Sequence, residues 1–207
     1  MSNKIDRRSV TQKLVYLSFL AALIVVLQVL ASYIKVGAVS ICLVLLPIVF
    51  GGMLFGLNAG LFLGIVFGLL TFILGLTGFD PGTLAMIQFK PIETFAICVI
   101  KGALAGLLSS LAYKGMFKLT KNNVYLSSLV GFIVAPVVNT SIYILGVALF
   151  FKDFYQFTQS GFALIVAIFI AIIVNFISEF LLNVICGPLI ALAASRNKSV
   201  KKILYKQ

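Results

Sequence analysis

The 207-residue sequence has no histidine, and charged residues make up only 10% of it. Histidine is the commonest general base and metal ligand near neutral pH, so its absence removes the simplest acid–base and metal chemistry. Soluble domains contain about 25% charged residues. Hydrophobic residues reach 62% here and occur in long runs, which is typical of a polytopic membrane protein with no room for a soluble catalytic domain.

Several catalytic motifs are also missing from the sequence. It contains no GxxxxGK[ST] loop for ATP, no HExxH, no GxSxG and no acidic metal cluster. The three cysteines, Cys42, Cys98 and Cys186, lie inside apolar runs without metal or disulfide spacing. We therefore expect neither an enzyme nor a cofactor, and we expect energy for any transport to come from elsewhere.

Six apolar segments are long enough to suggest membrane helices. They cover residues 14–33, 41–57, 59–77, 92–113, 125–150 and 161–194. A spanning helix needs about 20 apolar residues, and the second and third segments are joined so closely that they predict a tight hairpin. The sequence thus predicts an all-α integral membrane bundle of six transmembrane helices, forming one domain over residues 1–207.

Lysine and arginine lie mostly on one side of this predicted bundle. Four precede the first segment, three lie in the 114–123 connection and five lie in the tail, whereas the opposite side carries Lys35, Lys90 and Lys152. Cytoplasmic connections of membrane proteins are enriched in basic residues. We therefore expect both termini, with the basic ends 1–13 and 195–207, in the cytoplasm. The connections 34–40, 78–91 and 151–161 would then face outward.

Glycines recur every four residues along the predicted hairpin. The series is Gly52, Gly56, Gly60, Gly64 and Gly68. Small residues at this spacing let helix backbones approach closely in lipid. The pattern predicts tight packing within the chain, and the alternative is a sliding surface that changes partners.

Lys101 is a full charge inside an apolar run. It lies nine residues, or roughly 13 Å, from the outer end of its helix. A lysine at the bilayer centre costs at least about 2.5–3.5 kcal/mol on insertion scales. It must therefore face the bundle interior, a water-filled cavity or a carboxylate.

Two further polar groups lie at depth in the last two segments. Asn175, Glu179 and Asn183 recur every four residues and so share one face of a helix. Asn139 and Tyr143 follow Pro136, whose ring frees a backbone carbonyl.

These interior groups allow two interpretations. They hold helices together, with Lys101 paired to Glu179, or they form the floor of a ligand pocket that opens outward.

Three stretches carry a resemblance to a known family. They are "LLPIVFGGMLFGLNAGLFLGIVFGLLTFI" at 45–73, "KGALAGLLSSLAYK" at 101–114 and "PVVNTSIYILG" at 136–146. With the size, the six segments and the basic start, the chain resembles the S component of energy-coupling factor (ECF) transporters. The resemblance implies a membrane subunit that binds a vitamin from outside. It also implies partners, namely a transmembrane coupling subunit and two cytoplasmic ATPases.

The same resemblance implies particular site residues. In the family, the outer loops and the outer halves of helices four to six bind the ligand. This favours a set comprising Gln88, Lys90, Glu93, Asn139 and Tyr143, with Lys101 and Asn175 deeper. The family's first helix carries alanines four apart that contact the coupling subunit, and the nearest equivalents here are Ser18 and Ala22. Serine is small enough to pack in the same way.

The predicted function is therefore vitamin capture at the cell membrane for ATP-driven uptake. A lysine in the pocket favours a ligand with a carboxylate or phosphate, such as pantothenate, folate or a flavin nucleotide; uncharged riboflavin is a further candidate. The alternatives are a stand-alone secondary transporter or channel, or a small lipid-modifying enzyme that would need Glu93 and Glu179 to converge.

Overall fold

The computed structural model describes residues 7–33, 35–36, 39–40, 43–151, 161–197, 200, 201 and 203. The elements over this part of the chain are α1 (Arg7–Tyr33), β1 (Lys35–Val36), β2 (Val39–Ser40), α2 (Leu45–Phe55), α3 (Leu57–Leu76), α4 (Pro81–Phe89), α5 (Pro91–Leu119), α6 (Val124–Phe150) and α7 (Gly161–Ser195). The two short strands pair antiparallel, with Lys35 opposite Ser40. The fold is otherwise helical, as the sequence predicts.

Five helices are long and apolar enough to cross a membrane. These spans are Thr11–Tyr33, Leu57–Leu76, Pro91–Leu119, Val124–Phe150 and Ile172–Ser195. The predicted span 41–57 is represented by α2, which has only 11 residues and is therefore about 16 Å long. That length is short of the roughly 30 Å hydrocarbon core, so helix length supports five of the six predicted spans.

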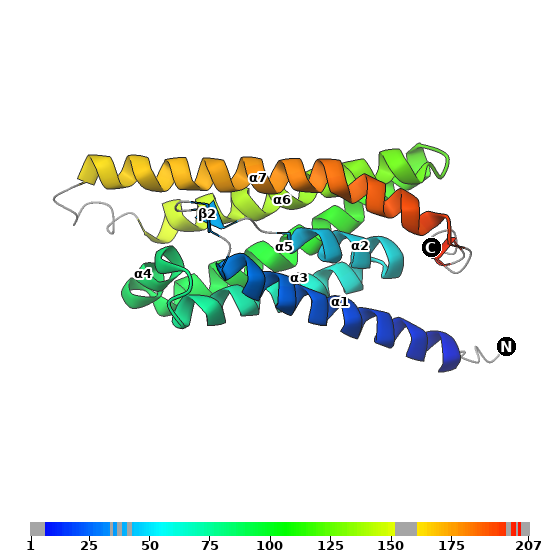
Figure 1. Cartoon of the computed structure of the whole chain (residues 1–207), viewed down its shortest axis with the longest axis horizontal. Helices are drawn as coiled ribbons and strands as arrows, with labels where there is room; N and C mark the ends of the chain where they lie inside the picture. Colours follow the sequence, from blue (N-terminus) through cyan, green and yellow to red (C-terminus); the bar gives the residue numbers. More distant parts are fainter. Residues whose placement is uncertain are drawn as a thin grey trace.

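The long helices run side by side along the length of the molecule (Figure 1). The start of α1, the turn between α5 and α6 and the end of α7 lie at one end. The short α4, the end of α6 and the start of α7 lie at the other. Below we call these the basic end and the α4 end.

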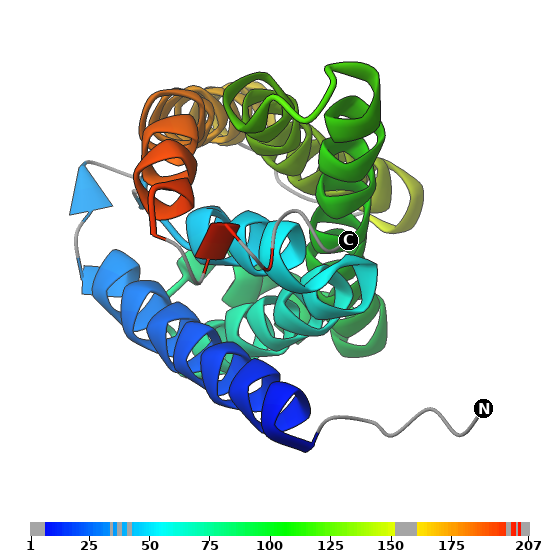
Figure 2. The same ribbon diagram turned by 90° about the vertical axis from the view of Figure 1, so that its right-hand side faces the viewer.

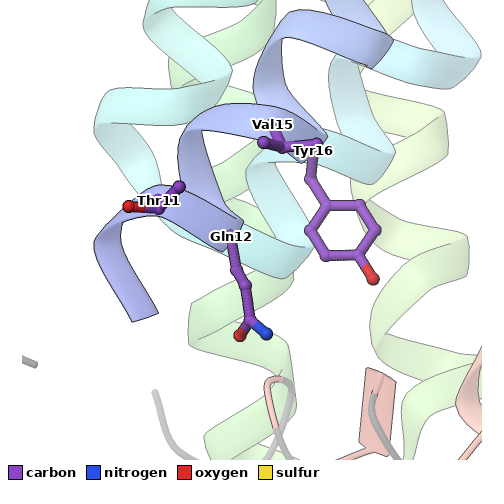
Figure 3. Close-up of a pocket in the computed structure, with 4 residues that line it drawn as sticks. All are labelled: Thr11, Gln12, Val15 and Tyr16. Atoms are coloured by element: carbon purple, nitrogen blue, oxygen red, sulfur yellow. The ribbon is translucent and has the colours of Figure 1, made fainter. Parts of the chain in front are cut away.

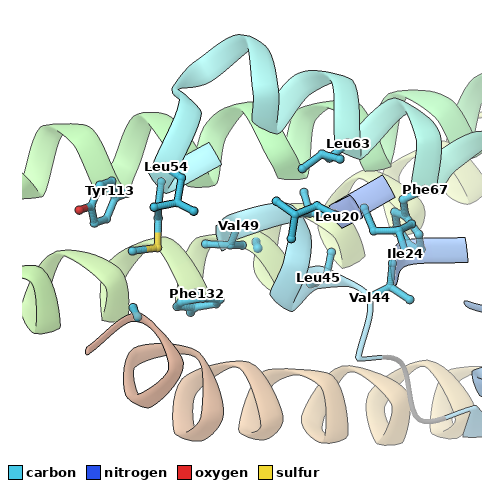
Figure 4. Packing of buried hydrophobic residues seen from close by; sticks show 14 of the residues in the cluster. Leu20, Ile24, Val44, Leu45, Val49, Leu54, Leu63, Phe67, Tyr113 and Phe132 are labelled. Carbon is cyan, nitrogen blue, oxygen red and sulfur yellow. The ribbon is translucent and has the colours of Figure 1, made fainter. Parts of the chain in front are cut away.

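The short helix α2 occupies the centre of the bundle. Viewed from the basic end, it is surrounded by the longer helices (Figure 2), and it packs against α1, α3, α5, α6 and α7. Its Leu45, Ile48, Val49 and Met53 are completely buried. They form one hydrophobic cluster with residues of the surrounding helices, such as Leu63 and Phe132 (Figure 4). The central position explains why an 11-residue helix can be entirely apolar.

Glycines on α3 and α5 bring the two backbones into direct contact. A Cβ added at Gly64 would collide with the carbonyl of Gly102, and one added at Gly60 would collide with the carbonyl of Gly106. Gly68 meets the carbonyl of Cys98 in the same way. The prediction of tight packing within the chain is confirmed for these glycines.

Two other glycines of the series have different surroundings. Gly52 faces the Ser110 side chain. Gly56 has nothing within 4 Å and a φ of +87°, so it forms the turn between α2 and α3 because only glycine adopts that conformation easily.

The connection 78–91, which the sequence predicts to face outward, contains a helix, α4, that the apolar runs do not reveal. Asp80 caps its start, because its Oδ1 accepts a hydrogen bond from the backbone nitrogen of Gly82 at 3.1 Å. Its Oδ2 accepts from the Thr83 hydroxyl at 2.5 Å. Pro81 occupies the first turn, where its missing N–H costs nothing. The α4 helix packs on α3 and α5 and lies at the α4 end of the bundle.

Candidate functional site

Lys90 lies at the junction between α4 and α5. Its extended backbone ends one helix and begins the next. The Lys90 ammonium donates a hydrogen bond to the backbone carbonyl of Phe150 at 2.8 Å. That carbonyl lies at the end of α6, where helix carbonyls lack partners within the helix. Lys90 therefore ties the α4–α5 junction to the end of α6.

The Lys101 side chain points into a group of aromatic residues. Its ammonium lies 5.1 Å from the ring centroid of Tyr143 on α6 and 5.9 Å from that of Phe67 on α3. The Tyr143 hydroxyl in turn donates to the sulfur of Met86 on α4 at 3.6 Å. Four helices thus meet at Lys101 and Tyr143, beneath α4.

The ring contacts only partly compensate the Lys101 charge. A cation over an aromatic ring gains about 0.5–1 kcal/mol at an exposed site, and about 2 kcal/mol when desolvated. Placing a lysine at membrane depth costs at least about 2.5–3.5 kcal/mol. Lys101 is half-buried, so its ammonium retains the capacity to bind an anionic group.

Asn139 lies one turn deeper than Tyr143 on α6 and contacts α7. Its side-chain nitrogen donates to the Glu179 carboxylate at 3.5 Å. Asn183, one turn further along α7, donates to the backbone carbonyl of Glu179 at 2.8 Å. All three side chains are buried. This buried cluster links α6 to α7 inside the bundle.

Lys101 and Glu179 contact different residues of α6, Tyr143 and Asn139. Within the described chain, the Lys101 ammonium lies over rings, whereas the Glu179 carboxylate accepts from Asn139. The reason is the position of α6, which packs against both α5 and α7. Each charged residue meets a different turn of α6.

The predicted ligand residues occupy three levels of the bundle. Gln88 is exposed on α4, and Glu93 is half-buried in the first turn of α5. Lys101 and Tyr143 lie together below them, with Asn139 one turn deeper. Asn175 is half-buried on α7, one turn towards the α4 end from Glu179.

Sequence reasoning did not identify Met86 and Phe67. Both contact the Lys101–Tyr143 pair, but neither carries a signal that separates it from other apolar residues. Residues 152–160, which belong to one of the connections predicted to face outward, lie outside the described residues, as does Cys42.

A separate hollow of about 320 Å³ lies beside the start of α1. It is lined by Thr11, Gln12, Val15 and Tyr16, and Gln12 and Tyr16 project to the same side (Figure 3). All four residues belong to one helix and are exposed. The hollow is at the basic end, far along the bundle from α4.

The α1 helix offers the most open flank of the bundle. Only 17% of its span is buried, against 28–44% for the other four long helices. Ser18 and Ala22 are exposed, whereas Leu20 and Ile24 are buried against the core. The two predicted contact residues therefore face away from the rest of the chain.

A comparison with protein families matches most of the chain to a known family. The family described as "ECF transporter, substrate-specific component" matches residues 12–204, which is nearly the whole chain. This chain belongs to the substrate-specific component family of ECF transporters. None of the curated proteins matches it significantly.

Family membership fixes the general role of this S component. It is a multi-pass membrane protein that binds a small-molecule substrate for transport, and it is not an enzyme. S components work with ECF membrane and ATPase modules, in agreement with the absence of an ATP-binding loop from the sequence. Membership also agrees with the resemblance on which the sequence prediction rests.

Proposed function

We propose that this S component captures a small vitamin of the B class, or a related micronutrient, and delivers it to an ECF complex. The site lies between α4, α5, α6 and α7, at the α4 end. The observation that carries the proposal is the Lys101 ammonium, which lies over Tyr143 inside the bundle and beneath α4. A charge in this position suits a ligand that brings its own negative group.

The proposed ligand residues act at successive depths. Gln88, Lys90 and Glu93 form the entrance to the site. Below them, Lys101 binds the anionic group of the ligand and Tyr143 binds its planar part. Asn139 and Asn175 bind the part of the ligand that reaches deepest into the bundle. A carboxylate or phosphate on the ligand would accept from Lys101. This favours pantothenate, folate or a flavin nucleotide over uncharged riboflavin.

The proposed orientation places the α4 end outside the cell. Lys114, Lys118 and Lys121 lie at or near the turn between α5 and α6, and Arg196 follows α7. These residues occupy the basic end, where α1 also begins. The positive-inside rule assigns that end to the cytoplasm. We propose that residues 1–207 form one substrate-binding domain with both basic ends inside.

The proposed partners are a transmembrane coupling subunit and two cytoplasmic ATPases. Ser18 and Ala22 are small and exposed on α1, so a helix of the coupling subunit can approach closely there. ATP hydrolysis by the partners then drives uptake.

The experiment that tests the site is ligand binding by the Lys101→Met variant. Native mass spectrometry of the detergent-purified wild type, incubated with pantothenate, folate, riboflavin and flavin mononucleotide, identifies the ligand. Hydrogen bonds to charged groups contribute about 1.5–3 kcal/mol. Lys101→Met should therefore raise the Kd of an anionic ligand about 10- to 150-fold. The matched control is Lys114→Met, at the basic end of the same helix.

Three results would count against this proposal. Unchanged affinity in a well-folded Lys101→Met protein would refute the role of Lys101. Loss of folding in that variant would indicate a structural role instead. Uptake by the S component alone, without a coupling subunit and ATPases, would favour a secondary transporter.

A further inference from the structure

The outer face of α5 changes from apolar to basic towards the end of the helix. Ile100 and Leu108 are exposed on this face, and Lys114 and Lys118 follow them one turn apart. Lys118 is exposed and Lys114 is half-buried. The buried residues of the helix, such as Ser109, lie on the opposite face. The two lysines are therefore on the outside of the bundle, in line with residues that face lipid.

The length of α5 places these lysines at the level of the lipid headgroups. The helix has 29 residues and is about 43 Å long, whereas a bilayer measures about 40–45 Å with its headgroups included. Lys114 and Lys118 lie about 9 Å and 15 Å beyond Leu108 along the helix axis. Tyr125, in the first turn of α6, is exposed at the same end. Tyrosine is common at the interface between membrane and water.

The charges of Lys114 and Lys118 are not balanced by an acidic side chain at the basic end of the described chain. The acidic residues that the structure describes are Asp80 before α4, Glu93 in the first turn of α5 and Glu179 on α7. Asp80 and Glu93 belong to the α4 end, and Glu179 is buried. Like charges one turn apart on a helix repel each other, so the pair suits an anion from outside the chain.

The helix surface between the two lysines is open. Gly115 lies there, and nothing is found within 4 Å of a Cβ added to it. A phosphate group can therefore approach the helix between the two ammonium groups. Lys121 follows in the turn with a φ of 52°, a left-handed conformation that glycine adopts more easily than lysine does. It brings a third positive charge close to the pair.

We propose that Lys114 and Lys118 bind the phosphate of an anionic phospholipid, whose acyl chains lie along the apolar part of the same face. The charges of the two partners are complementary, and a lipid presents its phosphate and its chains at the two depths where this face is basic and apolar. A soluble anion would leave the apolar part unused. The site is at the opposite end from the proposed vitamin site. The proposed orientation assigns it to the inner leaflet, and its test needs no vitamin.

The test measures the Kd of two lipids that have the same acyl chains, phosphatidylglycerol and phosphatidylcholine. Native mass spectrometry follows their binding to the purified S component in a nonionic detergent. A lysine near an anionic lipid contributes about fivefold in affinity, so the wild type should bind phosphatidylglycerol about 25-fold more tightly than phosphatidylcholine. The double variant Lys114→Gln/Lys118→Gln should bind both lipids equally. The control Lys13→Gln/Arg196→Gln removes the same charge from α1 and from the residue after α7, and should keep the preference.

Each outcome decides the proposal. A preference for phosphatidylglycerol that only Lys114→Gln/Lys118→Gln loses supports the site. Equal Kd values for both lipids in the wild type overturn it, and so does an equal loss in both double variants, because net charge alone would then explain the preference. Displacement of phosphatidylglycerol by glycerol 1-phosphate at equal concentration overturns the lipid assignment.

Two further measurements keep the test decisive. If the lysines serve an acidic protein partner instead, the double variant loses the coupling subunit in phosphatidylcholine alone and the wild type shows no preference between lipids; this result overturns the proposal. If the double variant fails to fold, Lys118→Gln, at an exposed position, replaces it and should lose about fivefold of the preference. An unchanged preference in Lys118→Gln overturns the proposal.

Discussion

Replacing Gly64 by alanine should destabilise the bundle through the contact between α3 and α5. An ideal Cβ at Gly64 would lie 2.8 Å from the carbonyl carbon of Gly102 and 3.2 Å from the Cα of Ala103. Non-bonded carbons prefer about 3.5–4.0 Å, so α3 and α5 must separate locally by at least about 0.7–1.2 Å, the difference from the 2.8 Å contact, because the carbonyl oxygen of Gly102 lies closer still. The neighbouring contacts at Gly60 and Gly68 lie on the same two helices and would loosen together.

The expected magnitude follows from the cost of overpacking. Adding a methyl group to a filled site typically costs 1–3 kcal/mol, which lowers the melting temperature of a protein of this size by roughly 2–12 °C. Circular dichroism of the detergent-purified protein measures this change. The matched control is Gly115→Ala on α5, where nothing lies within 4 Å of an added Cβ. It should leave stability unchanged or raise it by up to about 1 kcal/mol, because alanine favours helix.

The comparison of these two variants can refute the reasoning. If Gly64→Ala melts within 1 °C of the wild type, the backbone contact does not limit stability. The close approach of α3 and α5 would then be dispensable.

Two further substitutions test α4 and α1. Asp80→Ala removes the cap of α4 and should cost about 0.5–2 kcal/mol of local stability. Hydrogen exchange of the α4 amides should become faster, while exchange in α5 stays unchanged. Asp80→Asn should largely restore the protection of α4. Ala22→Trp places a large side chain on the exposed flank of α1. This variant should abolish uptake by the assembled ECF complex. Vitamin binding by the S component alone should stay normal. Leu111→Trp, an exposed position on α5, is its control, and equal loss of uptake in both variants would contradict a specific role for α1.

The apolar runs predicted the long helices well, because hydropathy reports which residues lie in lipid. They predicted the helix ends less well. The segment 92–113 became Pro91–Leu119, and 14–33 became Arg7–Tyr33. A helix can continue into water on charged residues such as Lys114 and Lys118, where hydropathy no longer identifies it.

The short elements escaped prediction for other reasons. The α4 helix has only nine residues, too few for a hydropathy signal, although Asp80 followed by Pro81 is a recognisable helix start. The contacts of Lys101 could not be predicted either. They depend on α5 packing beside both α3 and α6, and Phe67 differs in no way from its apolar neighbours in the sequence.

The contact between α3 and α5 also restricts how these helices can slide. No side chain separates Gly64 from Gly102 or Gly60 from Gly106, so there is no rotamer that could adjust to a shifted register. A slip of one residue would press Ile65 or Leu61 against the opposite backbone. The contact therefore opposes small slips of register, and we expect a reorientation of the protein in the membrane to carry both helices as one unit.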